Sequence, residues 1–281
     1  MSQPLVSICI PTYNGEKYLR ACLDSAVLQT FRDIEIVIVD DGSSDNTLTI
    51  INEYKQKDER IKVFINETNL GLVGNWNKCL ELAKGKWIKY LFQDDLLESK
   101  CLETMLSCAS DEKPFVVCKR EFLFESNVTP EIKKYYTEKT LTLDQIKKSD
   151  QAVYIDHVEF AKLVVKYLSL NFIGEPTAVL FRRNLVEKSG VFNPGFAQIC
   201  DLEYWMRIAS EHGVLYIPHA LAKFRVHASS VSFSNDVGKK FKSSFIDPIL
   251  IAYNLLFDVH YDHFRIHTPV FQKTKLNNYL K

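Results

Sequence analysis

Alternation between short apolar runs and helix-like segments in the first hundred residues constrains the fold more than any other feature of the sequence. Runs rich in Ile, Val, Leu and Phe occur at residues 5–11, 34–41, 61–66 and 86–92. Between them the apolar residues recur at helical spacing, at residues 16–30, 43–57 and 73–85. Strands and helices that alternate at this spacing form βαβ units, so we expect an α/β fold with a Rossmann-like, mainly parallel sheet flanked by helices.

Polar residues follow three of the predicted strands. The first ends in Pro11-Thr12-Tyr13-Asn14, the second in Asp40-Asp41-Gly42-Ser43-Ser44, and the fourth in Gln93-Asp94-Asp95. In open parallel sheets, ligands bind beyond the carboxyl ends of the strands. We therefore expect these three segments to face one crevice.

The adjacent carboxylates in these segments have two interpretations. Asp40 and Asp41 fit a helix entry, and a carboxylate there also suits hydrogen bonds from a base or a ribose. Asp94 and Asp95 fit a surface turn, or a cation site, because two close carboxylates repel and a divalent cation removes that cost. Mg²⁺ and Mn²⁺ are commonly held by one or two carboxylates together with substrate phosphates.

The second half of the chain is less regular. Residues 125–150 are polar and rich in Lys, which predicts a loop excursion with short helices. Helical patterns follow at residues 157–168 and 200–213, and the chain is helical and aromatic from residue 235. Strand-like runs lie at residues 177–183, 214–218 and 221–227.

Four further side chains in this half could act in chemistry or in structure. Asp201 lies in the first turn of a predicted helix, where a carboxylate complements the helix dipole, or where it could act as a general base. His227 ends a predicted strand and is either structural or a contact for a metal or a phosphate. Glu203 and Arg207 are four residues apart, which favours an ion pair on the helix.

Charge and cysteine usage narrow the class of protein. Lys plus Arg and Asp plus Glu both number 35, so no net electrostatic attraction to nucleic acid or anionic lipid follows. The seven cysteines form no CxxC pair, which is typical of a reduced, cytoplasmic protein without a zinc site. The N-terminal residues lack the pattern of a signal peptide, and the longest apolar stretch near the C-terminus is too short to span a bilayer.

The order of motifs resembles glycosyltransferase family 2, whose members are inverting nucleotide-sugar transferases with the GT-A fold. The segments that carry the resemblance are residues 6–47, 69–95, 176–192, 200–209 and 216–232. Together they cover the chain from residue 5 to residue 232, about four-fifths of its length. Each motif alone is weak, whereas the ordered set is highly specific.

The resemblance implies a role for each matching residue. On the nucleotide-sugar side it implies Pro11, Tyr13 and Asn14, with Asp41 at the base and Asp94 at the ribose or the neighbouring phosphate region. It implies Mn²⁺ or Mg²⁺ at the diphosphate, held by Asp95 and contacted by His227. It implies Asp201 as the catalytic base, with Glu175 and Thr177 on the acceptor side.

The implied function is transfer of a sugar from a nucleotide-diphosphate sugar, UDP- or dTDP-linked, to a hydroxyl of a glycan or a lipid-linked acceptor in cell-surface polysaccharide biosynthesis. A nucleotidyltransferase and a non-catalytic nucleotide-sugar-binding scaffold stay open as alternatives. We expect a catalytic domain at residues 1–234, with a nucleotide-sugar half at 1–97 and an acceptor half at 98–234. A helical extension at 235–281 is expected to pack on that domain or to touch the inner face of the plasma membrane.

Three residues depart from the family pattern. Gln93 stands where many relatives have Asp, and Cys200 precedes Asp201 where Glu is frequent. Trp76 occupies a place where Arg is often found, and it fits the core more simply than a phosphate contact. Because Asp95 and Asp201 are both present, we expect an active enzyme.

Overall fold

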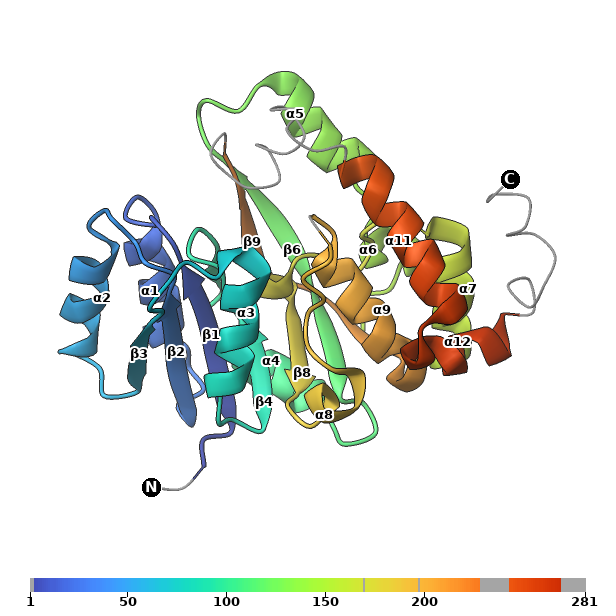
Figure 1. Ribbon diagram of the computed structural model, residues 1–281, viewed down its shortest axis with the longest axis horizontal. Helices are drawn as coiled ribbons and strands as arrows, with labels where there is room; N and C mark the ends of the chain where they lie inside the picture. Colours follow the sequence, from blue (N-terminus) through green and yellow to red (C-terminus); the bar gives the residue numbers. More distant parts are fainter. Residues whose placement is uncertain (1–2, 169, 197, 228–242, 269–281) are drawn as a thin grey trace.

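The computed structural model describes residues 3–168, 170–196, 198–227 and 243–268. Its strands form one nine-stranded sheet with the order β3-β2-β1-β4-β8-β6-β9-β5, and β7 pairs with β9. Helices cover both faces of this sheet (Figure 1). The predicted α/β class is therefore confirmed.

The first half of the sheet is parallel, as the alternation of patterns predicts. Its strands β3, β2, β1 and β4 lie in that order and run in one direction. In chain order the elements are β1 (Val6–Thr12), α1 (Leu19–Val27), β2 (Ile34–Asp40), α2 (Thr47–Lys55), β3 (Ile61–Ile65), α3 (Gly71–Leu82) and β4 (Trp87–Tyr90). The order reverses at β1, so a crevice opens beyond the ends of β1, β2 and β4.

The second half of the sheet is mixed. It contains β5 (Leu96–Leu97), β6 (Phe115–Phe124), β7 (Val153–Ile155), β8 (Val179–Arg182) and β9 (Val214–Val226). β8 is antiparallel to both β4 and β6, whereas β6 and β9 are parallel. The sequence patterns identified no strand at β6.

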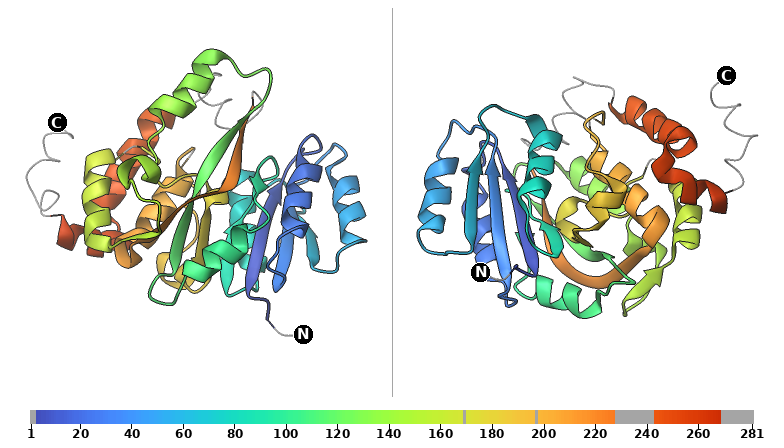
Figure 2. Two further views of the ribbon diagram at one scale, coloured as in Figure 1. Left: turned by 180° about the vertical axis from the view of Figure 1, so that it is seen from behind. Right: turned by 60° about the horizontal axis from the view of Figure 1, so that its bottom comes forward.

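The structure joins the two strands predicted at residues 214–218 and 221–227 into the single strand β9. Its register against β6 shifts between Ile217 and Ala220, opposite Cys118 and Lys119, so Pro218 falls in a bulge. A proline cannot donate to the ladder, and a bulge is where a sheet tolerates it. Pro218 therefore marks a bulge rather than a strand end, and Figure 2 shows β9 curving through the second half of the sheet.

Two apolar clusters fill the space between the sheet and the helices. In β1, Cys9 faces one cluster, while Ile8 and Ile10 face the other, because successive side chains of a strand alternate. The first cluster includes residues of α3, α7 (His157–Tyr167) and α9 (Cys200–His212). The second includes residues of α1, α2 and α4 (Cys101–Cys108), which gives a three-layer arrangement (Figure 2).

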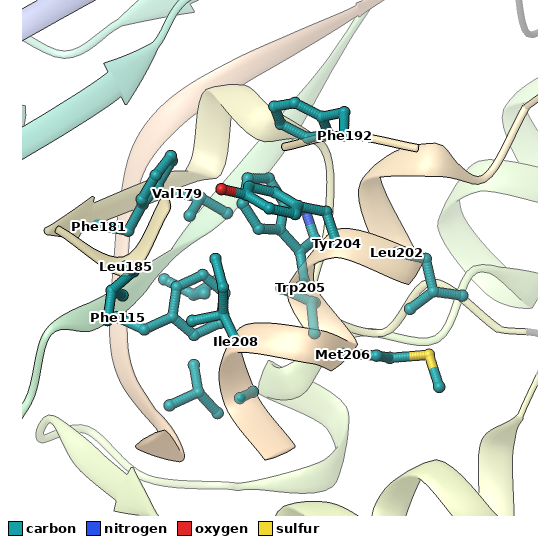
Figure 3. Packing of buried hydrophobic residues seen from close by; sticks show 14 of the residues in the cluster. Phe115, Val179, Phe181, Leu185, Phe192, Leu202, Tyr204, Trp205, Met206 and Ile208 are labelled. Atoms are coloured by element: carbon teal, nitrogen blue, oxygen red, sulfur yellow. The ribbon is translucent and has the colours of Figure 1, made fainter. Parts of the chain in front are cut away.

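Aromatic packing fixes α9 against the sheet. Figure 3 shows Tyr204 and Trp205 of α9 among aromatic side chains of β6, β8 and the segment before α9. Trp205 is fully buried, and its ring centroid lies 5.6 Å from Phe115 and 5.8 Å from Phe181. Tyr204 packs 4.3 Å from Phe192. This packing positions the first turn of α9, which carries Asp201.

The remaining elements are short helices and a C-terminal helical pair. The predicted polar excursion contains α5 (Pro130–Lys134), a π-type turn η1 (Tyr135–Lys139) and α6 (Leu143–Ile146). A 3₁₀ turn η2 (Pro176–Ala178) precedes β8, and α8 (Leu185–Ser189) follows it. The C-terminal elements are α11 (Ser243–Phe257), η3 (Val259–Tyr261) and α12 (Asp262–His267). The predicted boundary at residue 234 lies outside the described residues, and the division at residue 97 stays a prediction.

Candidate active site

A cavity of about 370 Å³ lies beyond the carboxyl ends of β1, β2 and β4. We call the residues at and just after the carboxyl ends of these strands its strand side, and those of η2, α9 and the segments before them its helix side. The strand side contains Pro11, Thr12, Tyr13, Asp41, Phe92, Gln93 and Asp94. The helix side contains Glu175, Pro176, Gln198 and Asp201, and α3 contributes Gly71, Leu72, Asn75 and Trp76. The three predicted strand-end segments therefore meet at one cavity.

Asp41 is held by the start of α3. One carboxylate oxygen accepts hydrogen bonds from the side-chain amide of Asn66 and the backbone N–H of Leu70, both at 2.8 Å. The other oxygen accepts from the backbone N–H of Gly71 at 3.0 Å. Asp41 is buried, yet it lines the cavity. Asp40 instead caps the loop after β2 by accepting from Ser43, which fits the helix-entry interpretation.

Gln93 clamps the end of β1. Its side-chain oxygen accepts from the backbone N–H of Tyr13 at 2.9 Å, and its side-chain N–H donates to the carbonyl of Tyr13 at 3.0 Å. A carboxylate cannot make the second of these bonds, because it has no donor. A Cβ at Gly15 would lie 2.3 Å from the Gln93 oxygen, so a side chain there would displace the Gln93 amide. This pairing accounts for the departure at Gln93.

The loop after β1 makes its hydrogen bonds within the protein. The N–H of Asn14 donates to the Ser43 hydroxyl at 2.9 Å, and that of Gly15 donates to the Thr47 hydroxyl at 2.8 Å. The Asn14 side chain accepts from the N–H of Ser44 at 2.8 Å, and Asn14 has a positive φ of 47°. Asn14 does not line the cavity. Asn14 joins the loops after β1 and β2, so it contributes to the cavity by holding the backbone of these loops in place.

Asp94 of the strand side contacts His227, which follows β9 and does not itself line the cavity. An Asp94 carboxylate oxygen lies 2.8 Å from His227 Nε2, although the two residues are 133 positions apart in the chain. Asp94 lines the cavity and keeps part of its side chain exposed. Arg225 holds the backbone at this point, because its Nε donates to the Asp94 carbonyl at 2.8 Å.

Asp95 points away from the cavity and is fully buried. One of its carboxylate oxygens accepts from the Thr177 hydroxyl at 2.5 Å, and the other accepts from the backbone N–H of Arg225 at 2.9 Å. Burial, followed by the nearby Asp94 charge, raises the pKa of Asp95 well above its usual range. Thr177 is also buried and outside the cavity lining, and its carbonyl accepts from the buried ammonium of Lys89. The structure thus separates the two adjacent aspartates.

The chemistry of these side chains fits a divalent cation at Asp94 and His227. A carboxylate suits Mg²⁺ and Mn²⁺, and an imidazole suits the transition metals. Within the described ranges, no cluster of three or more His, Cys, Asp or Glu side chains could hold a metal ion. A cation at this place would therefore depend on ligands from a substrate, as Mg²⁺ sites on phosphate substrates do.

Asp201 lies on the helix side of the cavity and is mostly buried. Its carboxylate accepts from the side-chain amide of Asn171 at 2.9 Å and from the backbone N–H of Leu202 at 2.7 Å. Burial raises the pKa of Asp201 to about 7, and the Glu175 charge adds to this effect, while Arg120 opposes it. A carboxylate with a pKa near neutrality and access to a cavity can accept a proton from a ligand.

Glu175 shares the helix side with Asp201 and forms an ion pair with Arg120 of β6. The Arg120 side chain is almost fully buried, while part of the Glu175 side chain is exposed. Gly174 has a φ of 115°, and a Cβ there would lie 2.5 Å from an Arg120 nitrogen. Because Gly174 has no side chain, the Arg120 guanidinium fits beside Glu175.

Several contributors to the site carried no signal in the sequence. Asn171 and Arg120 contact carboxylates, and Arg225 contacts the backbone carbonyl of Asp94; these partners lie far apart in the chain, and only the tertiary structure brings them together. Trp76 packs in the core, with its ring 4.7 Å from Phe92, and also lines the cavity. The predicted ion pair between Glu203 and Arg207 is present at 2.8 Å, and it is buried.

The chain matches the family Glycosyl transferase family 2 over residues 7–189, which is more than half of its length. The chain belongs to this family. The membership makes the protein a glycosyltransferase by class and confirms the resemblance carried by its motifs.

Two curated proteins are similar to this family 2 chain, and the similarity covers different shares of their lengths. It is 31% identical over 242 residues to "Uncharacterized protein MT1568" of Mycobacterium tuberculosis (strain CDC 1551 / Oshkosh), covering 82% of this chain and 69% of the relative. It is 43% identical over 103 residues to a chondroitin synthase of Escherichia coli, covering 37% of this chain and 15% of that protein.

Two solved structures share the fold of this family 2 chain. Staphylococcus aureus TarS, residues 1–349, in complex with UDP-GlcNAc has a TM-score of 0.69 at 20% identity, covering 95% of this chain and 71% of that one. Mannosyltransferase PcManGT of Pyrobaculum calidifontis, in complex with GDP-Man and Mn²⁺, has a TM-score of 0.60 at 15% identity, covering 100% and 79%. The fold is the predicted GT-A fold.

Proposed function

We propose that this chain is an inverting transferase that moves a sugar from a nucleotide-diphosphate sugar to a hydroxyl of a glycan or a lipid-linked acceptor. One observation carries this proposal. A single cavity has a buried aspartate, Asp201, with a pKa of about 7 on its helix side, and Asp94, which contacts His227, on its strand side. This arrangement suits a reaction that needs a base at one reacting oxygen and charge neutralisation at another.

Asp201 would act as the general base. Near neutral pH about half of it is ionised, so it can accept the proton of an acceptor hydroxyl as that oxygen attacks the anomeric carbon. The new carbon–oxygen bond forms on the face opposite the leaving diphosphate, and the old bond breaks with its electron pair left on the diphosphate. Asn171 orients the carboxylate by its hydrogen bond, and Glu175 would contact the acceptor beside it.

Asp94 and His227 would hold Mn²⁺ or Mg²⁺ on the strand side. When bound, the cation would supply the positive charge that neutralises the leaving diphosphate. We assign the cation to Asp94 rather than to Asp95, because Asp94 lines the cavity, whereas Asp95 is fully buried outside its lining. Asp95 and Thr177 would then position the segment that carries Asp94.

Asp41 supports a uridine or thymidine donor. A carboxylate has about four lone-pair positions, and three of those on Asp41 accept hydrogen bonds within the protein. One position is left for an N–H donor, which uracil and thymine present on their ring. Pro11 and Tyr13 line the cavity beside it and would contact the base. The TarS complex with UDP-GlcNAc supports the same donor class through its shared fold.

We further propose that the product is a cell-surface polysaccharide made at the cytoplasmic side of the membrane. The similarity to a chondroitin synthase supports a glycan acceptor. The seven cysteines are free thiols, which supports a reducing compartment. In the part of the chain that the structure describes, no helix is long and apolar enough to cross a bilayer.

The geometry argues against the two alternatives. A nucleotidyltransferase of this class needs free backbone N–H groups after β1 to cradle phosphates. Here the N–H groups of Tyr13, Asn14, Gly15 and Glu16 all donate to side chains of the protein. A non-catalytic scaffold has no need for a buried aspartate with a pKa near neutrality in the cavity.

Release of free nucleoside diphosphate tests the proposal. We expect release that depends on both a nucleotide sugar and an acceptor, with UDP- or dTDP-sugars raising the melting temperature in the presence of Mn²⁺. A panel of nucleotide sugars that leaves the melting temperature unchanged, with and without Mn²⁺, would contradict donor binding. Release of pyrophosphate from a sugar 1-phosphate and a nucleoside triphosphate would favour the nucleotidyltransferase instead.

A further inference from the structure

Helix α11 exposes a continuous apolar stripe. Its outward residues Ile246, Ile249, Tyr253 and Phe257 are 49%, 48%, 59% and 61% exposed. They recur every three or four residues, so they lie along one side of the helix over about 16 Å. We call these four residues the α11 stripe. Figure 1 shows α11 along one edge of the molecule.

The opposite side of α11 is already used for packing. Ile251 and Leu255 are fully buried in the cluster that also contains α9, and Asp247 is buried with them. A surface helix normally carries charged residues on its outward face. In α11 the single charged residue is Asp247, and it faces inward, so no charge interrupts the exposed side.

The sequence on both sides of the C-terminal helices is basic. Lys239, Lys240 and Lys242 precede α11, and no acidic residue occurs from 237 to 246. Lys273, Lys275 and Lys281 follow α12, and residues 268–281 contain no acidic residue. Asp258 and Asp262 lie between the end of α11 and the second group of lysines, so in the sequence only the first group directly adjoins the stripe.

The stripe begins beside the helix side of the cavity. A carboxylate oxygen of Asp247 accepts from the backbone N–H of Gln198 at 2.9 Å and of Ile199 at 3.1 Å. Gln198 lines the cavity, and Asp201 follows two residues after Ile199. The first turn of α11 is therefore joined to the segment that carries the candidate base.

We propose that the α11 stripe lies in the interface of an anionic lipid membrane. An apolar helix face that directly follows a cluster of lysines is a pattern by which interfacial helices bind such membranes, and a Tyr on that face suits the headgroup level. A second copy of the chain fits less well, because one four-residue stripe is small beside the roughly 800 Å² that each partner of a stable protein complex buries.

The consequence for the acceptor rests on the proposed function. A membrane at α11 would bring the helix side of the cavity to the lipid surface, where the hydroxyl of a lipid-linked acceptor is available to Asp201. Membrane binding itself needs no nucleotide sugar, so its test is independent of the transfer reaction.

Co-sedimentation of the full chain with lipid vesicles tests the proposal. We expect binding to vesicles of phosphatidylcholine mixed with phosphatidylglycerol, and weaker binding to phosphatidylcholine alone. The double variant Tyr253→Ser/Phe257→Ser is expected to bind the mixed vesicles roughly tenfold or more weakly, because it removes two inserted rings. Leu28→Ser/Ile65→Ser is the matched control, since those residues are 63% and 59% exposed in the other half of the molecule; it is expected to bind like the unmodified chain.

A second measurement does not depend on losing a side chain. All three native tryptophans are buried, so a Phe257→Trp variant places one exposed reporter on the stripe. We expect its emission to shift to the blue when mixed vesicles are added. The proposal is overturned if the unmodified chain stays in the supernatant, if the stripe variant binds as well as the control, or if the reporter does not respond. It is also overturned if the chain is a dimer that the stripe variant dissociates, since the occupant is then a second copy.

Discussion

On the strand side of the cavity, Asp41 accepts hydrogen bonds from two backbone N–H groups and one amide, whereas on the helix side Asp201 accepts from one of each. Asp41 is held by the start of α3, the next helix but one along the chain. Asp201 is held by Asn171 and is influenced by Glu175, both from the loop between α7 and η2, and by Arg120 of β6.

The different surroundings of Asp41 and Asp201 suit the two roles proposed for the cavity, which are binding on its strand side and reaction on its helix side. Three hydrogen bonds fix the orientation of the Asp41 carboxylate, which suits a fixed acceptor of N–H groups. Burial with few donors destabilises the charged form, and it raises the pKa of Asp201 to about 7. A base needs that second environment, because it has to take up a proton during the reaction.

The largest expected effect follows from removing the base. Asp201→Asn should lower kcat by about 10³-fold, in the range typical of a general base, with little change in nucleotide affinity. Steady-state kinetics with a nucleotide-release assay, together with calorimetry of UDP binding, measure the two quantities. Near-normal turnover in this variant would refute the assignment of Asp201.

Asp201→Asn is expected to increase the stability of the fold, although it lowers the activity. The pKa of Asp201 is about 7 when folded and about 3.9 in an unfolded chain, so the folded state binds the proton more tightly. Its contribution to stability is therefore present at low pH and is lost as the pH rises from about 4 to 7. Asp201→Asn should raise the free energy of unfolding by roughly 1–3 kcal/mol at pH 8. Urea unfolding that shows no gain at pH 8 would contradict the raised pKa.

The two adjacent aspartates should respond in opposite ways. Asp94→Ala should weaken Mn²⁺-dependent nucleotide binding about 100-fold and leave the fold intact, because it removes one of two proposed ligands. Asp95→Ala should destabilise the fold by about 2–4 kcal/mol, because it leaves the Thr177 hydroxyl and the Arg225 N–H without a partner. Calorimetry with and without Mn²⁺ and urea unfolding compare them. The reverse pattern would return the cation to Asp95.

The fall of kcat/KM at acidic pH tests the charges around Asp201 on the helix side. We expect kcat/KM to fall tenfold per pH unit below about pH 7, as Asp201 becomes protonated. Arg120→Gln should move this fall to higher pH, because Arg120 lowers the pKa of Asp201 and pairs with Glu175. Arg182→Gln is a control, since Arg182 forms its ion pair with Asp111, neither of which lines the cavity. If kcat/KM of the Arg120→Gln variant falls at the same pH as that of the unmodified chain, Arg120 contributes only to the fold.

The smallest expected effect concerns the clamp at Gln93. Gln93→Glu keeps an acceptor for the Tyr13 N–H and loses the donor to the Tyr13 carbonyl. We expect nucleotide affinity to fall roughly threefold to tenfold, which corresponds to the loss of about one hydrogen bond in the pocket wall. Gln3→Glu is a matched control, because that amide donates to a backbone carbonyl away from the cavity. Equal affinities in the two variants would mean that the clamp does not shape the nucleotide site.

Much of the fold followed from local patterns, and the exceptions have physical causes. The parallel direction of β1, β2, β3 and β4 follows from apolar runs that alternate with helical segments. β9 was predicted as two strands, because Pro218 resembles a strand end until the bulge against β6 is known. β6 gave no clear pattern, because its buried first half is followed by charged and partly exposed residues.

The sequence by itself determined the GT-A fold and the family, and it indicated which segments would meet at the cavity. Strand ends, helix entries and motif order are local properties, so one chain carries them without its neighbours. Only the tertiary structure decided that Asp94, and not Asp95, faces the cavity, since adjacent side chains at a strand end can turn either way. It also decided the raised pKa of Asp201, because desolvation is the sum of everything packed around a group.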